Sequence, residues 1–121
     1  MKTPGPDHPI TIEPNPHRVV VTLGGHTIAN SSHALMLKEA THPPVHYIPR
    51  EDVDMAVLER TTHATHCPYK GDAAYYSLRS NGRLAENAVW TYEAPYEAVA
   101  EIKEHLAFYP KLVDSIEERP A

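Results

Sequence analysis

The sequence has little of several features that large classes of protein require. It contains one cysteine in 121 residues, Cys67, which excludes an internal disulfide and a zinc site built from several cysteines. No apolar run approaches the roughly 20 residues of a membrane-spanning helix. Residues 1–6 lack the apolar stretch of a secretory signal. We therefore expect a cytoplasmic protein with no membrane partner.

Positive charge is also scarce. Eleven Lys and Arg stand against sixteen Asp and Glu, which gives a formal net charge of −5. Sequence-independent binding to a phosphate backbone needs clustered cations, so we expect no nucleic-acid partner. The sequence has no Gly-rich phosphate loop, no G-x-S-x-G and no H-E-x-x-H motif. We accordingly predict no cofactor and no metal.

Proline, in contrast, is abundant. Twelve prolines are about twice the average share. Proline lacks a backbone N–H and is excluded from helix interiors and central strands, so the chain is divided into short segments. The apolar share of 41% supports a modest core. We expect a flexible arm over residues 1–9 and a single domain over residues 10–121.

Short strands separated by turns dominate the pattern. Gly24-Gly25 and Asn81-Gly82 are hairpin signals, because two-residue turns of this kind need positive φ angles. Residues 34–40 fit a strand or a helix, and residues 49–52 suggest one helical turn. The best helix runs over 95–105, where Val99, Ile102 and Leu106 form an apolar stripe. The predicted fold is mainly β, with short antiparallel strands and one C-terminal helix. The strands are expected at 10–13, 18–23, 26–30, 45–48, 55–60, 61–67, 73–79 and 84–93.

The densest group of reactive side chains surrounds Cys67. His66 and Lys70 are close in sequence, and nearby cations favour the thiolate that a nucleophilic cysteine requires. The alternative is a buried cysteine that packs before a turn, since cysteine is among the most buried residue types. His63 and His66 are the nearest possible metal ligands. Alternation along a strand would turn them to opposite faces, which argues against chelation.

Aromatic side chains suggest a ligand pocket. Tyr and Trp suit a site that is apolar but offers some hydrogen bonds, although a Tyr-rich core gives the same pattern. Arg50 suits recognition of an anion, although the Arg50-Glu51-Asp52 trio also fits a solvated helical turn. The aromatic residues considered are Tyr47, Tyr69, Tyr75, Tyr76, Trp90, Tyr92, Phe108 and Tyr109.

Four stretches together resemble a known family. They are PPVHYIPREDV at 43–53, THCPYKGDAAYY at 65–76, AVWTYEAP at 88–95 and AFYP at 107–110. Their order and content, above all the CPYKG core followed by W-x-Y-x-x-P, resemble the bacterial and fungal family called domain of unknown function 427 over residues 15–118. The resemblance implies a β-tent (Mss4-like) architecture, in which coiled antiparallel sheets meet at an angle. It supplies no activity, and no Gly-Ser with paired acids supports the nucleotidyltransferase label the family has carried.

We predict a small-molecule-binding or catalytic domain of unassigned activity. Its site should lie where the turn at 67–71 meets Trp90, Tyr47 and Arg50, near the CPYKG motif. One alternative is an enzyme with Cys67 as its catalytic residue, and another is a structural or interaction module without a pocket. The sequence leaves the oligomeric state open. The predicted ligand-binding residues are Tyr47, Arg50, Tyr69, Lys70, Tyr75 and Trp90.

Overall fold

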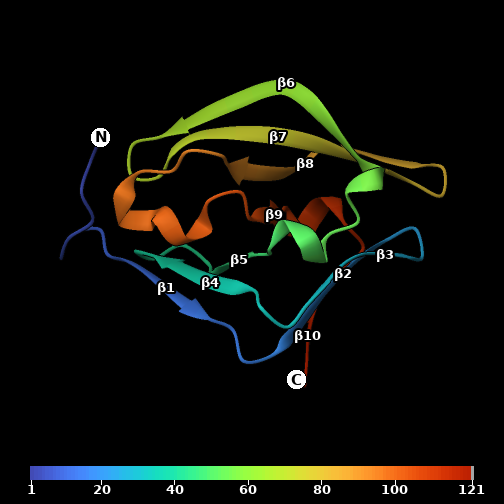
Figure 1. Cartoon of the computed structure of the whole chain (residues 1–121), viewed down its shortest axis with the longest axis horizontal. Coiled ribbons are helices and arrows are strands. Elements are labelled where there is room, and N and C mark those ends of the chain that lie inside the picture. The colour runs from blue at the N-terminus through green and yellow to red at the C-terminus, as the bar shows by residue number, and fades with distance from the viewer. Residues whose placement is uncertain (121) are drawn as a thin grey trace.

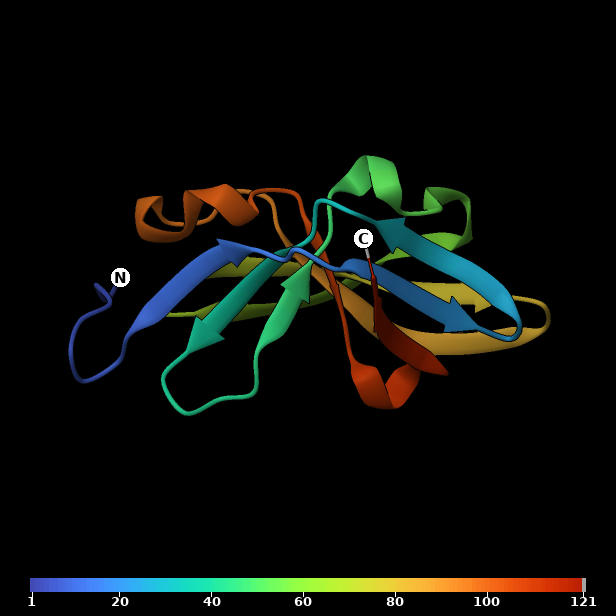
Figure 2. The same cartoon turned by 90° about the horizontal axis from the view of Figure 1, so that it is seen from below.

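The computed structural model describes residues 1–120 and is mainly β, as predicted. Its strands form three antiparallel sheets, ordered β1-β4-β5, β10-β2-β3 and β6-β7-β8-β9. In Figure 1 the strands β6, β7 and β8 form an upper layer, and β1, β4, β2 and β3 lie beneath it. Figure 2, seen from below, shows the strands of the smaller sheets in front of the larger sheet and at an angle to it. The strands are β1 (Ile10–Pro14), β2 (Arg18–Leu23), β3 (His26–Ser31), β4 (Leu35–Glu39), β5 (Val45–Tyr47), β6 (Leu58–Cys67), β7 (Gly71–Ser80), β8 (Arg83–Tyr92), β9 (Leu106–Phe108) and β10 (Ser115–Arg119).

Both predicted hairpins are present. Gly24 and Gly25, between β2 and β3, have φ angles of 60° and 78°. Asn81 and Gly82, between β7 and β8, have φ angles of 50° and 77°. Two consecutive positive φ angles match the twist of the flanking strands, and glycine adopts them without steric cost. The segment at 34–40, which was open between strand and helix, forms strand β4.

The turn between β6 and β7 has the sequence Pro68-Tyr69-Lys70 and ends at Gly71, as the composition indicates. Gly71 has a φ angle of 109°, a backbone conformation that residues with a Cβ rarely adopt. Cys67 and Gly71 are register partners across the turn. The turn therefore holds Lys70 at a fixed place at the end of the larger sheet.

The predicted C-terminal helix over 95–105 is wrong. A 3₁₀ helix covers Glu97–Ile102, and Val99 inside it has non-helical angles of φ −126° and ψ 28°. The apolar spacing of Val99 and Ile102 also fits a helix with three residues per turn. An α-helix of this length would be only marginally stable by itself. Soon after the segment the chain forms β9, which pairs with β8.

Residues 1–120 contain three further 3₁₀ turns, and two of them fall on predicted elements. Arg50–Asp52 forms the expected helical turn. Met55–Val57 is 3₁₀ rather than strand, so β6 begins only at Leu58. Pro110–Leu112 forms the last such turn. None of the helices within residues 1–120 is long and apolar enough to cross a membrane.

The core is divided into two clusters. The larger cluster joins β2 and β3 to the larger sheet through residues such as Val21, Leu78 and Val89. The smaller cluster includes Tyr47 and Tyr92, with Trp90 packed against it. Successive side chains of a strand alternate between faces, so β8 supplies Val89 to one cluster and Trp90 to the other. The smaller cluster surrounds the cavity described next.

Candidate functional site

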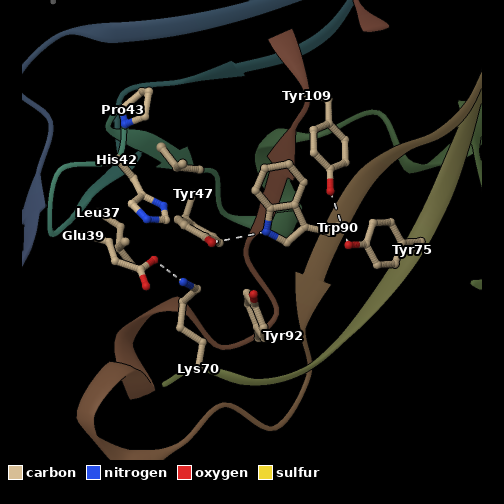
Figure 3. A pocket seen from close by; sticks show the side chains of 11 residues that line it. Leu37, Glu39, His42, Pro43, Tyr47, Lys70, Tyr75, Trp90, Tyr92 and Tyr109 are labelled. Atoms are coloured by element: carbon tan, nitrogen blue, oxygen red, sulfur yellow. Dashed lines mark hydrogen bonds and ion pairs between the residues drawn. The ribbon is translucent and has the colours of Figure 1, made fainter. Parts of the chain in front are cut away.

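A cavity of about 190 Å³ lies between the β4–β5 strands and the larger sheet (Figure 3). Tyr75 and Trp90 are register partners on β7 and β8, so their side chains project from the same face. Leu37 and Val45 are register partners on β4 and β5 and form the opposite wall. Two sheets thus build one site. Its lining residues are Leu37, Glu39, His42, Pro43, Val45, Tyr47, Lys70, Tyr75, Trp90, Tyr92 and Tyr109.

Two of the lining residues, Lys70 and Glu39, form an ion pair. The Lys70 ammonium donates to the Glu39 carboxylate, and the two side chains are only 10% and 12% exposed. His8 lies 2.7 Å from the other carboxylate oxygen. Burial raises the pKa of Glu39, but the hydrogen bonds from Lys70 and His8 outweigh it and hold the pKa below the ordinary value. Glu39 is therefore ionised at neutral pH, and its charge is balanced by that of Lys70.

Trp90 and Tyr47 form the centre of the aromatic wall. Trp90 Nε1 donates to the Tyr47 hydroxyl at 3.2 Å, and the two rings meet edge to face. Because Tyr47 accepts this bond, its own O–H hydrogen is left for another acceptor. Burial raises the pKa of Tyr47 and that of Tyr92. Both phenols are therefore neutral donors at physiological pH.

Two tyrosines, Tyr75 and Tyr109, form one side of the cavity. The hydroxyls of Tyr75 and Tyr109 lie 3.3 Å apart, and Thr65 Oγ1 lies 3.0 Å from the Tyr75 hydroxyl. Burial, followed by the bond with Tyr75, raises the pKa of Tyr109 to about 12. The Tyr109 ring lies 4.4 Å from the Trp90 ring, measured between centroids. This side offers an aromatic surface of two rings tilted by 44°, with tyrosine hydroxyls beside it.

The structure brings four of the seven predicted site residues to the cavity: Tyr47, Lys70, Tyr75 and Trp90. Tyr69, Arg50 and Cys67 do not line it. Tyr69 stacks on His8, with 3.9 Å between ring centroids. Arg50 donates to the hydroxyl of Tyr76, at 3.0 Å. Cys67 is half-buried and packs against the smaller core cluster.

Several lining residues escaped the sequence prediction. Glu39 is 31 residues from Lys70, and no local pattern pairs them. His42 and Pro43 stand in the loop after β4, where the sequence indicates only a chain break. Tyr92 and Tyr109 belong to the aromatic residues considered but not to the predicted ligand-binding residues. The alternation of Trp90 and Tyr92 along one strand was the signal that would have found Tyr92.

Residues 1–9, predicted as a flexible arm, contact the outside of this site. The Lys2 amide donates to the Pro68 carbonyl at 2.7 Å, and the Ala40 amide donates to the Pro9 carbonyl at 2.8 Å. His8 lies between Tyr69 and Glu39. The arm thus holds both the CPYKG turn and the end of β4.

The histidines near Cys67 are separated. His66 lies 2.7 Å from the Asp72 carboxylate, whereas the His63 ring packs against Tyr75 at 4.4 Å. Within residues 1–120, no three or more His, Cys, Asp or Glu side chains are grouped so that they could hold a metal ion.

A family model described as "Domain of unknown function (DUF427)" matches residues 11–119. This range includes every residue that lines the cavity. No curated protein matches the chain.

Proposed function

The chain belongs to the DUF427 family, and we propose that it binds a small, uncharged ring compound carrying several hydrogen-bonding groups, in the cavity between Tyr47 and Trp90. The single observation that carries this proposal is an aromatic-walled cavity whose one ion pair is already complete. The family description names no activity. The proposal therefore depends on the charge, the hydrogen-bonding groups and the size of the site.

Charge balance selects an uncharged ligand. Glu39 and Lys70 already satisfy one another, so the cavity has no spare charge for an ionic ligand. A ligand carboxylate or ammonium would bring a further charge beside this pair, and that charge would have no counter-charge of its own. Burying an unbalanced charge at low dielectric is unfavourable. A neutral ligand avoids this penalty.

The polar groups around the cavity suit a ligand with both donors and acceptors. Tyr47 keeps a hydroxyl hydrogen to donate. The Lys70 ammonium has three hydrogens, one of which is engaged with Glu39. The Glu39 carboxylate retains lone pairs as acceptors. Aromatic faces between these groups would hold the flat face of a ring.

Size limits the ligand to about one ring. Pockets for drug-sized ligands have volumes of about 300–1,000 Å³, and this cavity has about 190 Å³. A single six-membered ring with one or two polar substituents is the appropriate scale. Affinity for such a fragment should be modest, with a Kd of about 1 mM, because few atoms make contact.

The proposal is tested with three probes of matched shape, namely benzamide, benzoate and benzylammonium, titrated in turn by protein-detected NMR. We expect benzamide to shift the resonances of cavity residues, with both charged probes at least about fivefold weaker. Tighter binding of benzoate or benzylammonium would contradict the uncharged class. No binding of any probe would contradict the site itself.

A matched pair of variants assigns the binding to the cavity. Tyr47→Phe removes a hydroxyl that lines the cavity, and Tyr69→Phe makes the same change outside it. Loss of one hydrogen bond should weaken benzamide binding several-fold in Tyr47→Phe, since such a bond contributes about 1 kcal/mol. Tyr69→Phe should bind as the wild type does. Equal effects of the two changes would show that the probe binds elsewhere.

Three finer expectations belong to this proposal. We infer that the meeting of the sheets is the β-tent arrangement that the resemblance implies, and that the CPYKG motif serves to position Lys70. A cytoplasmic location agrees with a single cysteine that has no partner for a disulfide. Cys67 lies outside the cavity lining, which favours binding over thiol chemistry.

A further inference from the structure

A second, smaller hollow of about 70 Å³ adjoins the cavity. The two share the lining residues Val45 and Trp90, which therefore stand at the boundary between them. Figure 3 shows Trp90 in the wall of the larger cavity, between Tyr47 and Tyr109. Trp90 is half-buried, so its ring is not enclosed by the core on all sides. One aromatic side chain thus contacts two hollows of different character.

The smaller hollow is mainly apolar. Ile48, Phe108 and Ile116 contribute to its walls, and Pro44 and Pro110 contribute at its exposed side. Its one titratable lining residue is His46, whose Nε2 lies 3.6 Å from a carboxylate oxygen of Glu118. An apolar hollow of this kind holds water poorly, because water needs two or more polar partners. An apolar group of suitable size would fill it favourably.

We propose that the two hollows are chambers of one site, and that the ligand is a neutral polar ring bearing a short apolar arm. The ring would occupy the chamber with the Glu39–Lys70 pair, and the arm would pass beside Trp90 and Val45 into the smaller chamber. This inference rests on the proposed function and narrows its ligand class. The polar chamber is the reason for the hydrogen-bonding ring, and the apolar chamber is the reason for the apolar arm.

The volume limits the length of the arm. A water molecule's share of liquid volume is about 30 Å³, and a methyl or methylene group is of comparable size. About 70 Å³ therefore accommodates roughly two carbon groups. Each buried methylene should tighten binding about fourfold. A longer arm would have to leave the chamber and would lose this gain.

The test is a series of benzamides with methyl, ethyl or butyl groups at C3 or C4, titrated against the full chain by NMR. At one of the two ring positions, binding should tighten about fourfold from benzamide to the methyl compound, and again to the ethyl compound. The butyl compound should bind no better than the ethyl compound. Equal affinity of benzamide and all its alkyl derivatives would overturn the second chamber.

Variants separate this inference from the proposed function. Ile116→Phe fills the smaller chamber, and Ile12→Phe makes the same change at a half-buried position of β1 outside both hollows. Ile116→Phe should bind benzamide as the wild type does but should lose the gain from the ethyl group. Ile12→Phe should keep that gain. Absence of benzamide binding refutes the proposed function, whereas a gain that survives Ile116→Phe refutes only the second chamber.

Discussion

Glu39 at the end of β4 and Lys70 in the turn before β7 form a nearly buried ion pair, although 31 residues separate them in the sequence. The pair joins the sheet of β1, β4 and β5 to the larger sheet at the floor of the cavity. Its burial makes it a structural element, and its neutrality is the basis of the proposed ligand class. Both properties lead to measurements.

Lys70→Met should destabilise the fold strongly. Breaking a buried pair by removing one partner leaves an uncompensated charge, at a cost of about 3–5 kcal/mol. Here His8 still contacts Glu39, so we expect the lower end of that range. Urea unfolding measures the change. The double variant Glu39→Leu with Lys70→Met removes both charges and should recover much of the loss.

An exposed pair provides the control for that experiment. Arg79 and Glu59 are 2.9 Å apart, but their side chains are 59% and 53% exposed. Arg79→Met should change the free energy of unfolding by less than about 1 kcal/mol, because exposed pairs contribute little. If Lys70→Met and Arg79→Met change the free energy of unfolding by similar amounts, the Glu39–Lys70 pair contributes no more to stability than an exposed pair does.

The lowered pKa of Glu39 predicts acid sensitivity. The unfolded carboxyl titrates near its ordinary value of 4.5, and the folded one titrates lower. The stabilisation is therefore fully present above pH 4.5 and is lost as the pH falls through the folded pKa. Glu39→Gln should flatten this part of the profile of unfolding free energy against pH. An unchanged acid slope in Glu39→Gln would show that other carboxyls, such as Glu118, account for it.

Alkaline titration should reveal the buried tyrosines. Because burial raises the pKa of Tyr47 and of Tyr92, neither should form tyrosinate while the fold persists. Tyrosinate absorbance, followed together with circular dichroism, should rise in two stages, and the second should coincide with unfolding. A single stage completed in the folded protein would contradict the burial of these phenols.

The turn that positions Lys70 depends on Gly71. Its φ of 109° strains any side chain, so Gly71→Ala should destabilise the protein by about 1–3 kcal/mol. Gly5 is the matched control, because its φ is not in the left-handed region and an added Cβ would meet no atom within 4 Å. Gly5→Ala should leave the thermal midpoint nearly unchanged. Equal midpoints for the two variants would show that the turn tolerates another conformation.

The sequence predicts those elements whose causes are local. Gly24-Gly25 and Asn81-Gly82 specify their hairpins, because only a few residue types adopt two consecutive positive φ angles. The turn before Gly71 is predicted because Pro68 fixes its own φ angle and Gly71 adopts a positive φ angle without steric cost. The helix over 95–105 failed because an apolar spacing of three residues fits a 3₁₀ helix as well as an α-helix. The choice between the two helix types depends on tertiary structure, because the chain must next place β9 beside β8.

The site was predicted in part, for a related reason. Tyr75 and Trp90 are in the cavity because the second hairpin sets them opposite one another, and that hairpin is readable in the sequence. Glu39 reaches Lys70 only through the packing of two separate sheets, which no local pattern specifies. Arg50 is predicted from its chemistry alone, and the fold turns its guanidinium toward the Tyr76 hydroxyl instead.

Binding at Trp90 is tested most directly by fluorine NMR, since Trp90 is the only tryptophan in the chain. Protein labelled with 5-fluorotryptophan should give one resonance, which reports on the boundary between the two hollows. We predict that benzamide shifts this resonance saturably and that benzoate at the same concentrations shifts it much less. A resonance that benzamide leaves unmoved would contradict a ligand site between Tyr47 and Trp90.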